Sequence, residues 1–140
     1  MRHLVLASHA HFAQGIAESL ELLAGHPCDV HVINAFVDGS SDVTAQIDAL
    51  LATIPQTDEL VVATDLMGGS VTNAFLNRIQ NQERIYLVAN MNLPLLLTLA
   101  LSLNDAPDLP QLLRELVASS EVSPKYCNDL LSDIYDDDDF

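Results

Sequence analysis

One short stretch of the chain, residues 60–79, limits the folds that this sequence can adopt. It begins with the apolar run Leu60 to Ala63, which is too short for a surface helix and indicates a strand buried on both faces. Asp65 follows at the carboxyl end of this strand, and Gly68-Gly69 comes next. A helical pattern then begins at Ser70, which we predict to be its N-cap. Buried strands that lead directly into helices are typical of parallel sheets in α/β folds.

The remainder of the chain repeats this alternation of apolar runs and helical spacing. We predict strands over residues 4–7, 30–36, 60–63 and 85–89, and helices over residues 12–24, 43–54, 70–79, 95–103 and 109–119. On the second strand, Val30, Val32 and Ala35 are expected to face inward. The predicted fold class is α/β, with a mostly parallel sheet of four strands flanked by helices on both faces. We expect one domain over residues 1–128 and an acidic C-terminal tail over residues 129–140.

A histidine stands at the end of the first predicted strand, as Asp65 does at the end of the third. If these strands are neighbours in a parallel sheet, His9 and Asp65 lie at the same edge, where α/β folds bind their ligands. The Gly68-Gly69 loop and the helix start after it offer free backbone N–H groups and the positive end of a helix dipole, which favour phosphate. A neutral imidazole is a nucleophile near pH 7, so the pattern favours reversible phosphoryl transfer.

Three motifs in the sequence resemble the signatures of one known family. They are Ser8-His9-x-x-Phe12-Ala13-x-Gly15, Asp65-Leu66-x-Gly68-Gly69-Ser70-x-x-Asn73 and Asn90-x-Asn92-Leu93-Pro94-x-Leu96. In order and separation they are similar to those of the mannose-class IIA component of the bacterial sugar phosphotransferase system, over roughly residues 2–120. Two positions depart from the family pattern: Ala10 stands where many members carry glycine, and Val71 where many carry proline.

The resemblance assigns roles to individual residues. It implies that His9 accepts the phosphoryl group and that Asp65 accepts a hydrogen bond from one ring nitrogen of His9, which leaves the other nitrogen as the nucleophile. Ser70 and the backbone around Met67, Gly68 and Gly69 would hold the phosphoryl oxygens. The implied border of the pocket consists of Ser8, Asn90, Asn92 and Pro94. Helix capping by Ser70 and ordinary turn roles for the asparagines are the structural alternatives. No cofactor is implied.

The resemblance also implies a function and partners. The family acts as a cytosolic phosphotransferase, in which the histidine takes a phosphoryl group from the histidine phosphocarrier protein HPr and passes it to a IIB component for sugar uptake. The IIA component itself never touches the sugar. Family members form homodimers whose subunits exchange an antiparallel strand. Residues 117–128 are the candidate for that strand here, although Pro124 weakens it because proline cannot donate to a β-ladder.

Three alternative functions agree less well with the sequence than a phosphocarrier of the sugar phosphotransferase system. The phosphocarrier subunit of a dihydroxyacetone kinase shares the histidine at the first strand's end, but the loop of residues 65–70 favours the sugar transporter. A non-catalytic regulatory domain of the same fold is disfavoured because His9, Asp65 and Ser70 are all present. A nucleotide-binding domain is disfavoured because Lys125 is the only lysine and no G-x-x-x-x-G-K-[ST] motif occurs.

The composition restricts what the chain can bind. A formal net charge of −15, from 20 Asp and Glu against 5 Lys and Arg, predicts repulsion from nucleic acids and anionic membranes and favours basic protein partners. The chain has neither a run of about 18 apolar residues nor a signal peptide, so we expect a cytosolic protein without direct membrane insertion. Cys28 and Cys127 are therefore expected to be free thiols.

The other histidines carry weaker patterns. His11 lies two residues after His9, but this spacing supplies at most two ligands, so we predict no metal site. His3, His26 and His31 have no motif around them and are expected at the surface or at a sheet edge.

Overall fold

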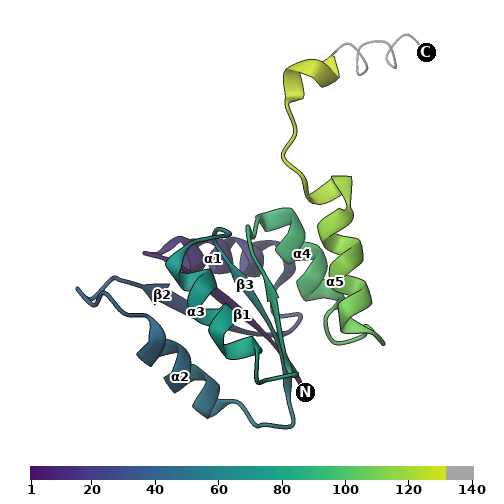
Figure 1. Cartoon of the computed structure of the whole chain (residues 1–140). Coiled ribbons are helices and arrows are strands. Elements are labelled where there is room, and N and C mark those ends of the chain that lie inside the picture. Colours follow the sequence, from purple (N-terminus) through teal and green to yellow (C-terminus); the bar gives the residue numbers. More distant parts are fainter. Residues whose placement is uncertain (132–140) are drawn as a thin grey trace.

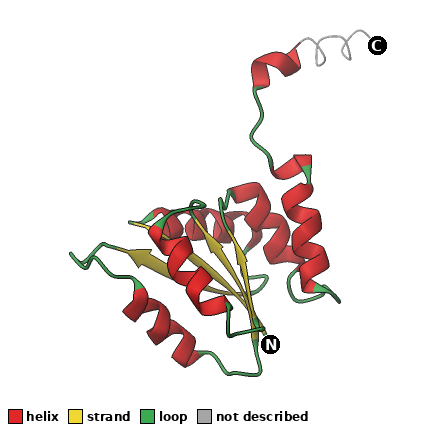
Figure 2. Ribbon diagram, in the orientation of Figure 1, coloured by secondary structure: helices red, strands yellow, loops and turns green. Residues whose placement is uncertain are grey.

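Four parallel strands form a sheet in the computed structural model, which describes residues 1–131 (Figures 1 and 2). The strands are β1 (Arg2–His9), β2 (Asp29–Ala35), β3 (Glu59–Thr64) and β4 (Ile85–Val88). The helices are α1 (Phe12–Ala24), α2 (Thr44–Thr53), α3 (Ser70–Ile79), α4 (Leu93–Ser102) and α5 (Leu109–Ala118), followed by the 3-10 helix η1 (Ser120–Val122). The predicted α/β class is confirmed.

Helices cover both faces of the sheet, because alternate residues of its central strands point in opposite directions. Leu4 and Leu6 of β1 lie in a core shared with α1, α4 and α5. Val5 and Ala7 lie in a second core shared with α2 and α3. All four side chains are completely buried, which accounts for the continuous apolar run in this strand. Figure 1 shows α2 and α3 on one side of the sheet and α4 and α5 on the other.

The strand order β2-β1-β3-β4 determines where a ligand can bind. β1 and β3 are parallel neighbours, with Ala7 opposite Thr64 near their carboxyl ends. The chain passes from β1 outward to β2, and from β3 outward to β4 on the other side. The carboxyl ends of β1 and β3 therefore flank the point where the strand order reverses, which is the usual ligand position in open α/β sheets. His9 ends β1 and Asp65 directly follows β3.

The C-terminal part of the chain leaves the body of the domain. Within the described residues, 117–128 form no strand: α5 ends at Ala118, η1 follows, and residues 123–126 have neither helix nor strand. Asn92 Nδ2 donates a hydrogen bond of 2.7 Å to the Val122 carbonyl, which ties the start of this segment to α4. Figure 1 shows the segment then leading away from the sheet. The predicted acidic tail lies outside the described residues from position 132 onward.

The inward direction predicted for Val30 is wrong. This residue is 37% exposed, whereas Ala35 is buried as expected, Val32 is partly buried against the core shared with α1, α4 and α5, and Ile33 is buried as well. The reason is that β2 is an edge strand of the sheet, where the helices cover the amino end less completely than the carboxyl end.

Cys28 and Cys127 are both free, in agreement with the expectation from the sequence. No helix within residues 1–131 has the length and apolar character needed to cross a membrane.

The surface position predicted for His3 is also wrong, since the residue is 7% exposed. Its Nε2 lies 2.8 Å from Oδ2 of Asp58, and its Nδ1 lies 3.1 Å from Nε2 of His31. The terminal amine of Met1 donates to the other carboxylate oxygen of Asp58, at 3.3 Å. This chain of hydrogen bonds joins the amino ends of β1 and β2 to the turn before β3. One proton can be shared between Nδ1 of His3 and Nε2 of His31, whereas two protonated rings would repel each other.

The hydrogen bonds that join His31, His3 and Asp58 lead us to expect a lower free energy of unfolding in acid. Burial lowers the pKa of His31 from 6.5, the charge of His3 lowers it further, and Asp29 opposes both. The unfolded chain therefore binds a proton more readily, so the free energy of unfolding falls as the pH drops below about 6.5. Replacing the ring by His31→Gln should flatten this dependence between pH 6.5 and 5, as measured by urea unfolding. His26→Gln is the control, because the His26 side chain is 81% exposed. Equal slopes for His31→Gln and the unmodified protein would contradict the prediction.

Candidate functional site

The carboxylate of Asp65 holds His9 by two hydrogen bonds at the carboxyl edge of the sheet. Asp65 Oδ2 accepts from the backbone N–H of His9 at 2.8 Å and lies 2.7 Å from Nδ1 of the His9 ring. Oδ1 accepts from the N–H of Leu66 at 3.0 Å. Burial raises the pKa of Asp65, but the hydrogen bonds from His9 and Leu66 outweigh it, and the net pKa is lowered. Asp65 is therefore an ionised acceptor at neutral pH.

An ionised Asp65 determines which nitrogen of His9 is free. A carboxylate can only accept hydrogen bonds, so the proton of a neutral His9 ring must sit on Nδ1. Nε2 then carries a lone pair, and the hydroxyl of Ser70 lies 3.2 Å from it. The His9 side chain is 41% exposed, whereas that of Asp65 is 11% exposed. The site thus presents an accessible nucleophilic nitrogen above a covered carboxylate.

The loop between β3 and α3 supplies unpaired backbone donors beside this nitrogen. Within residues 1–131, no recorded hydrogen bond uses the N–H groups of Gly68, Ser70 or Val71. These groups lie at the start of α3, where the helix dipole is positive and an anion is favoured. The N–H of Met67, also expected to face the phosphoryl group, instead donates to Oδ1 of Asn90 at 2.8 Å. The N–H of Gly69, likewise expected to face the phosphoryl group, donates to the Leu66 carbonyl at 3.3 Å, so the unpaired loop donors among the described residues are those of Gly68, Ser70 and Val71.

Ser70 is not the N-cap of α3, contrary to the prediction. Gly69 occupies the N-cap position, and no side chain caps this helix end. Ser70 is the first helical residue, and its hydroxyl is turned toward His9 instead of the helix backbone. The uncapped helix end leaves its N–H groups available for a ligand.

The geometry favours glycine at both positions of the loop. Gly68 has a φ of 82°, in the left-handed region that favours glycine. A Cβ at Gly69 would lie 3.3 Å from Cε1 of His9 and 3.2 Å from Cγ of Leu66. The absent side chain of Gly69 therefore allows the imidazole to lie directly against the loop.

The other residues predicted to border the His9 pocket contribute mainly to the starts of α1 and α4. Ser8 is completely buried, and its Oγ accepts from the N–H of Ala13 at 2.7 Å at the start of α1. Asn92 caps α4 by accepting from the N–H of Leu95 at 2.9 Å, and Pro94 lies in the first turn of the same helix. Asn90 alone contacts the loop, through Met67. None of the recorded hydrogen bonds in the described part of the chain joins Ser8, Asn92 or Pro94 to the His9 ring.

Sequence reasoning missed Phe36, which lies directly after β2 at the same edge. Its ring centroid is 5.3 Å from that of His9, with an interplanar angle of 46°. The available signal was its position at a strand's carboxyl end, the same rule that identified His9 and Asp65.

The backbone is strained at three points around the site. The non-glycine residues with positive φ among residues 1–131 are Ala10 at 52°, Phe36 at 66° and Asn90 at 59°. They follow β1, β2 and β4, respectively, at the edge that carries His9. Such conformations cost about 1–3 kcal/mol each and gather at functional sites.

No lysine or arginine takes part in the site. None of the ion pairs or hydrogen bonds in the described range connects such a side chain to His9, Asp65 or Ser70. Likewise, no group of three or more His, Cys, Asp or Glu within residues 1–131 is placed to hold a metal ion. An anion bound here would depend on backbone N–H groups, the Ser70 hydroxyl and the helix dipole.

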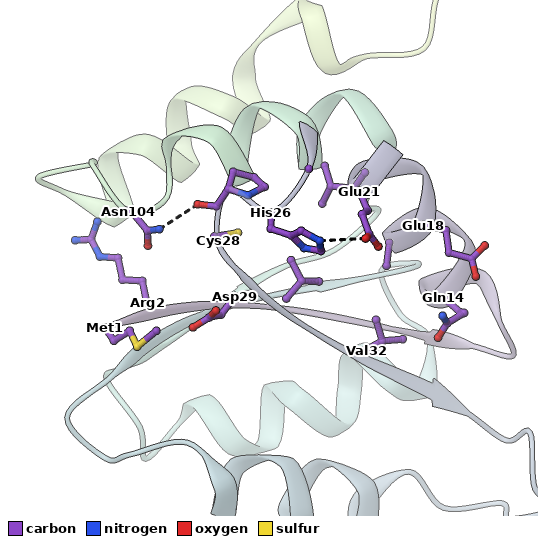
Figure 3. A pocket seen from close by; sticks show the side chains of 15 residues that line it. Met1, Arg2, Gln14, Glu18, Glu21, His26, Cys28, Asp29, Val32 and Asn104 are labelled. Carbon is purple, nitrogen blue, oxygen red and sulfur yellow. Dashed lines mark hydrogen bonds and ion pairs between the residues drawn. The ribbon is translucent and has the colours of Figure 1, made fainter. Parts of the chain in front are cut away.

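A large groove of about 1010 Å³ lies apart from this site, between α1 and the edge strand β2 (Figure 3). Its lining includes Glu18, Glu21 and Asp29, and Figure 3 shows His26 turned toward Glu21. The groove contains none of His9, Asp65 and Ser70. The geometry around His9 therefore identifies the candidate site better than cavity size does.

The tight contact at Gly69 predicts that a methyl group there will displace the His9 ring. In Gly69→Ala the new Cβ would lie 3.3 Å from Cε1 of His9 and 3.2 Å from Cγ of Leu66, so we expect the imidazole and the Leu66 side chain to shift by a few tenths of an ångström. We expect altered chemical shifts of the His9 ring in a ¹H–¹⁵N spectrum. Gly15→Ala is the matched control, since a Cβ there meets nothing within 4 Å. That variant should leave the ring signals unchanged and stabilise α1 by about 0.5–1 kcal/mol. Unchanged His9 signals in Gly69→Ala would refute the role given to this glycine.

Comparison with known proteins places the chain in a family. The family model EIIA-man, described as the PTS system fructose IIA component, matches residues 3–117. The PTS system fructose-specific EIIA component of Bacillus subtilis (strain 168) is 27% identical over 135 residues, which cover 96% of this chain and 92% of that protein. The sorbose-specific EIIA component of Lacticaseibacillus casei is 26% identical over 138 residues, covering 98% and 99%.

A solved structure agrees with these relatives. It is that of a candidate phosphoenolpyruvate-dependent sugar phosphotransferase system permease from Klebsiella pneumoniae subsp. pneumoniae MGH 78578, with a TM-score of 0.83 and 37% sequence identity over 93% of both chains. Sequence and fold therefore lead to the same assignment: the chain belongs to the mannose-class IIA family of the sugar phosphotransferase system.

Proposed function

We propose that this chain is a cytoplasmic phosphocarrier, in which Nε2 of His9 accepts a phosphoryl group from the histidine phosphocarrier protein HPr and passes it to a IIB component. The observation that carries the proposal is the 2.7 Å contact between Nδ1 of His9 and Oδ2 of Asp65. This contact places the proton on one nitrogen and leaves the other, accessible nitrogen as a nucleophile next to unpaired N–H groups.

The transfer step needs no proton movement. The lone pair of Nε2 forms a bond to phosphorus while the phosphorus–nitrogen bond of the donor histidine breaks, and that electron pair returns to the donor's ring. The proton stays on Nδ1 of His9, where the Asp65 carboxylate stabilises the positive charge that develops on the ring. The reverse sequence of bonds passes the phosphoryl group on to the acceptor. Positioning and electrostatics are then the main contributions of the protein.

The site is suited to brief occupation by phosphate. Ser70 and the N–H groups of Gly68 and Val71 offer hydrogen bonds to the phosphoryl oxygens, but no lysine or arginine of the described chain joins them. A phosphoryl group held without a cation is more readily released. The missing positive charge would come from partners with basic faces, which the net charge of −15 also attracts.

The histidines at positions 9 and 11 allow a direct test of the acceptor. His9→Gln should abolish phosphoryl acceptance from phosphorylated HPr, because it removes the nucleophile. His11→Gln should retain most of it, since His11 is exposed at the start of α1. Asp65→Asn should leave a slow acceptor, as amide replacement of the carboxylate in a hydrolase triad costs about 10⁴-fold. Mass-spectrometric mapping of the acid-labile phosphate measures all three. Phosphate on His11, or on the His9→Gln protein, would overturn the assignment.

The open edge of the sheet supports a homodimer as part of the proposal. A groove of about 370 Å³ lies along β4 and α5, lined by Tyr86, Leu87, Val88, Ala89, Pro110, Leu113, Arg114 and Val117. The segment after α5 leads away from its own domain, and its Tyr126 is 69% exposed. We propose that this segment covers the β4 edge of a second copy.

Sedimentation at micromolar concentration tests the assembly. We expect a species of twice the 15.2 kDa chain mass, because burying the exposed apolar side chains of the segment against a second copy is favourable. A chain ending at Ala118, which lacks the segment, should shift toward the monomer. A species of 15.2 kDa for the full chain would contradict the homodimer.

A further inference from the structure

Among residues 1–131, Phe36 is the one bulky non-glycine residue around the site with a positive φ. Its φ of 66° lies in the left-handed region, which is rare for large residues. Of the other two strained residues, Ala10 carries only a methyl group, and asparagine at position 90 tolerates this region. An aromatic residue at this position therefore needs a reason in its side chain.

The side chain of Phe36 points to the imidazole of His9. The two ring centroids are 5.3 Å apart and the planes are tilted by 46°, which is a favourable geometry for an aromatic pair. Phe36 is half-buried and also packs against the core shared with α2 and α3. That packing anchors its ring on the domain, so the ring can act as a fixed surface beside His9.

The hydrogen bonds of His9 hold the edge of its ring. Asp65 lies at Nδ1 and Ser70 at Nε2, and such hydrogen bonds lie near the plane of the imidazole. Phe36 adds an aromatic contact to the ring, with the two planes tilted by 46°. This contact opposes movements of the imidazole that would press the two rings together or carry them apart.

We propose that Phe36 is a positioning residue for phosphoryl transfer: its ring packs against the His9 imidazole and holds it in the orientation that aims the Nε2 lone pair at the open side of the site. The inference rests on the proposed function of His9. In-line displacement at phosphorus requires the attacking lone pair to be aligned, and a misplacement of about 1 Å can cost 10²-fold in rate. The strain at residue 36 is the structural cost of this alignment.

The test compares variants with and without an aromatic ring at position 36. Phe36→Leu and Phe36→Met keep apolar bulk but remove the ring, whereas Phe36→Tyr keeps the ring. Phe12→Leu is the matched control, because Phe12 starts α1 near the same edge, is 51% exposed and makes no ring contact with His9 among the described residues. Circular dichroism first establishes that each variant is folded.

Two measurements separate positioning from general stability. The first is the relaxation of the His9 ring signals in the unphosphorylated protein, which does not depend on any phosphoryl donor. The second is the separate determination of kcat and KM for transfer from phosphorylated HPr. We expect Phe36→Leu and Phe36→Met to mobilise the His9 ring and to lower kcat by about 10-fold to 10²-fold with little change in KM. Phe36→Tyr should keep the His9 ring mobility and the kcat of the unmodified protein. Phe12→Leu should leave the His9 ring signals unchanged.

Several results would overturn the inference. They are an unchanged His9 ring in both non-aromatic variants, a mobile ring with an unchanged kcat, a lowered kcat with an unchanged ring, or a tyrosine variant that behaves as the leucine variant does. Failure of the unmodified protein to accept phosphate would instead contradict the proposed function. In that case the relaxation measurement still decides whether Phe36 restrains His9.

Discussion

The hydrogen bonds between Asp65 and His9 are the interaction on which the site depends. A single carboxylate oxygen accepts from both the backbone and the ring of His9, at 2.8 and 2.7 Å. The first bond fixes where the residue lies relative to β3, and the second fixes which ring nitrogen keeps the proton. A side chain held only through its ring could still shift with the end of β1. Because Asp65 holds both the backbone and the ring of His9, the position of Nε2 is fixed relative to the sheet.

The parallel sheet makes this pair possible. Because β1 and β3 are neighbours that run in the same direction, residues at their carboxyl ends meet without any long loop. From β1 and β3 the chain continues to opposite sides of the sheet, which leaves room at the carboxyl ends of these two strands. The uncapped N-terminus of α3 lies beside this room. Among residues 1–131 no lysine or arginine pairs with His9, Asp65 or Ser70, which is consistent with the phosphocarrier role proposed above, because a basic partner can supply the missing charge.

Much of this architecture is predictable from the sequence, because buried parallel strands produce continuous apolar runs and their ends are marked by polar residues. The meeting of His9 and Asp65 follows from that rule once β1 and β3 are neighbours. The same rule places Phe36 at this edge, directly after β2, but its contact with His9 is not predictable in this way, since a left-handed backbone at a phenylalanine has no sequence signal. The use of the Met67 N–H by Asn90 and the burial of His3 depend on contacts across strands, which local patterns do not report.

The nitrogen that carries phosphorus is the most direct test of the account. After phosphorylation of protein labelled with ¹⁵N-histidine, a ³¹P–¹⁵N correlation spectrum identifies the bonded nitrogen of His9. Because Asp65 occupies Nδ1, the account predicts phosphorus on Nε2 and a retained proton on Nδ1. A phosphorus–nitrogen coupling to Nδ1 of His9 would contradict it.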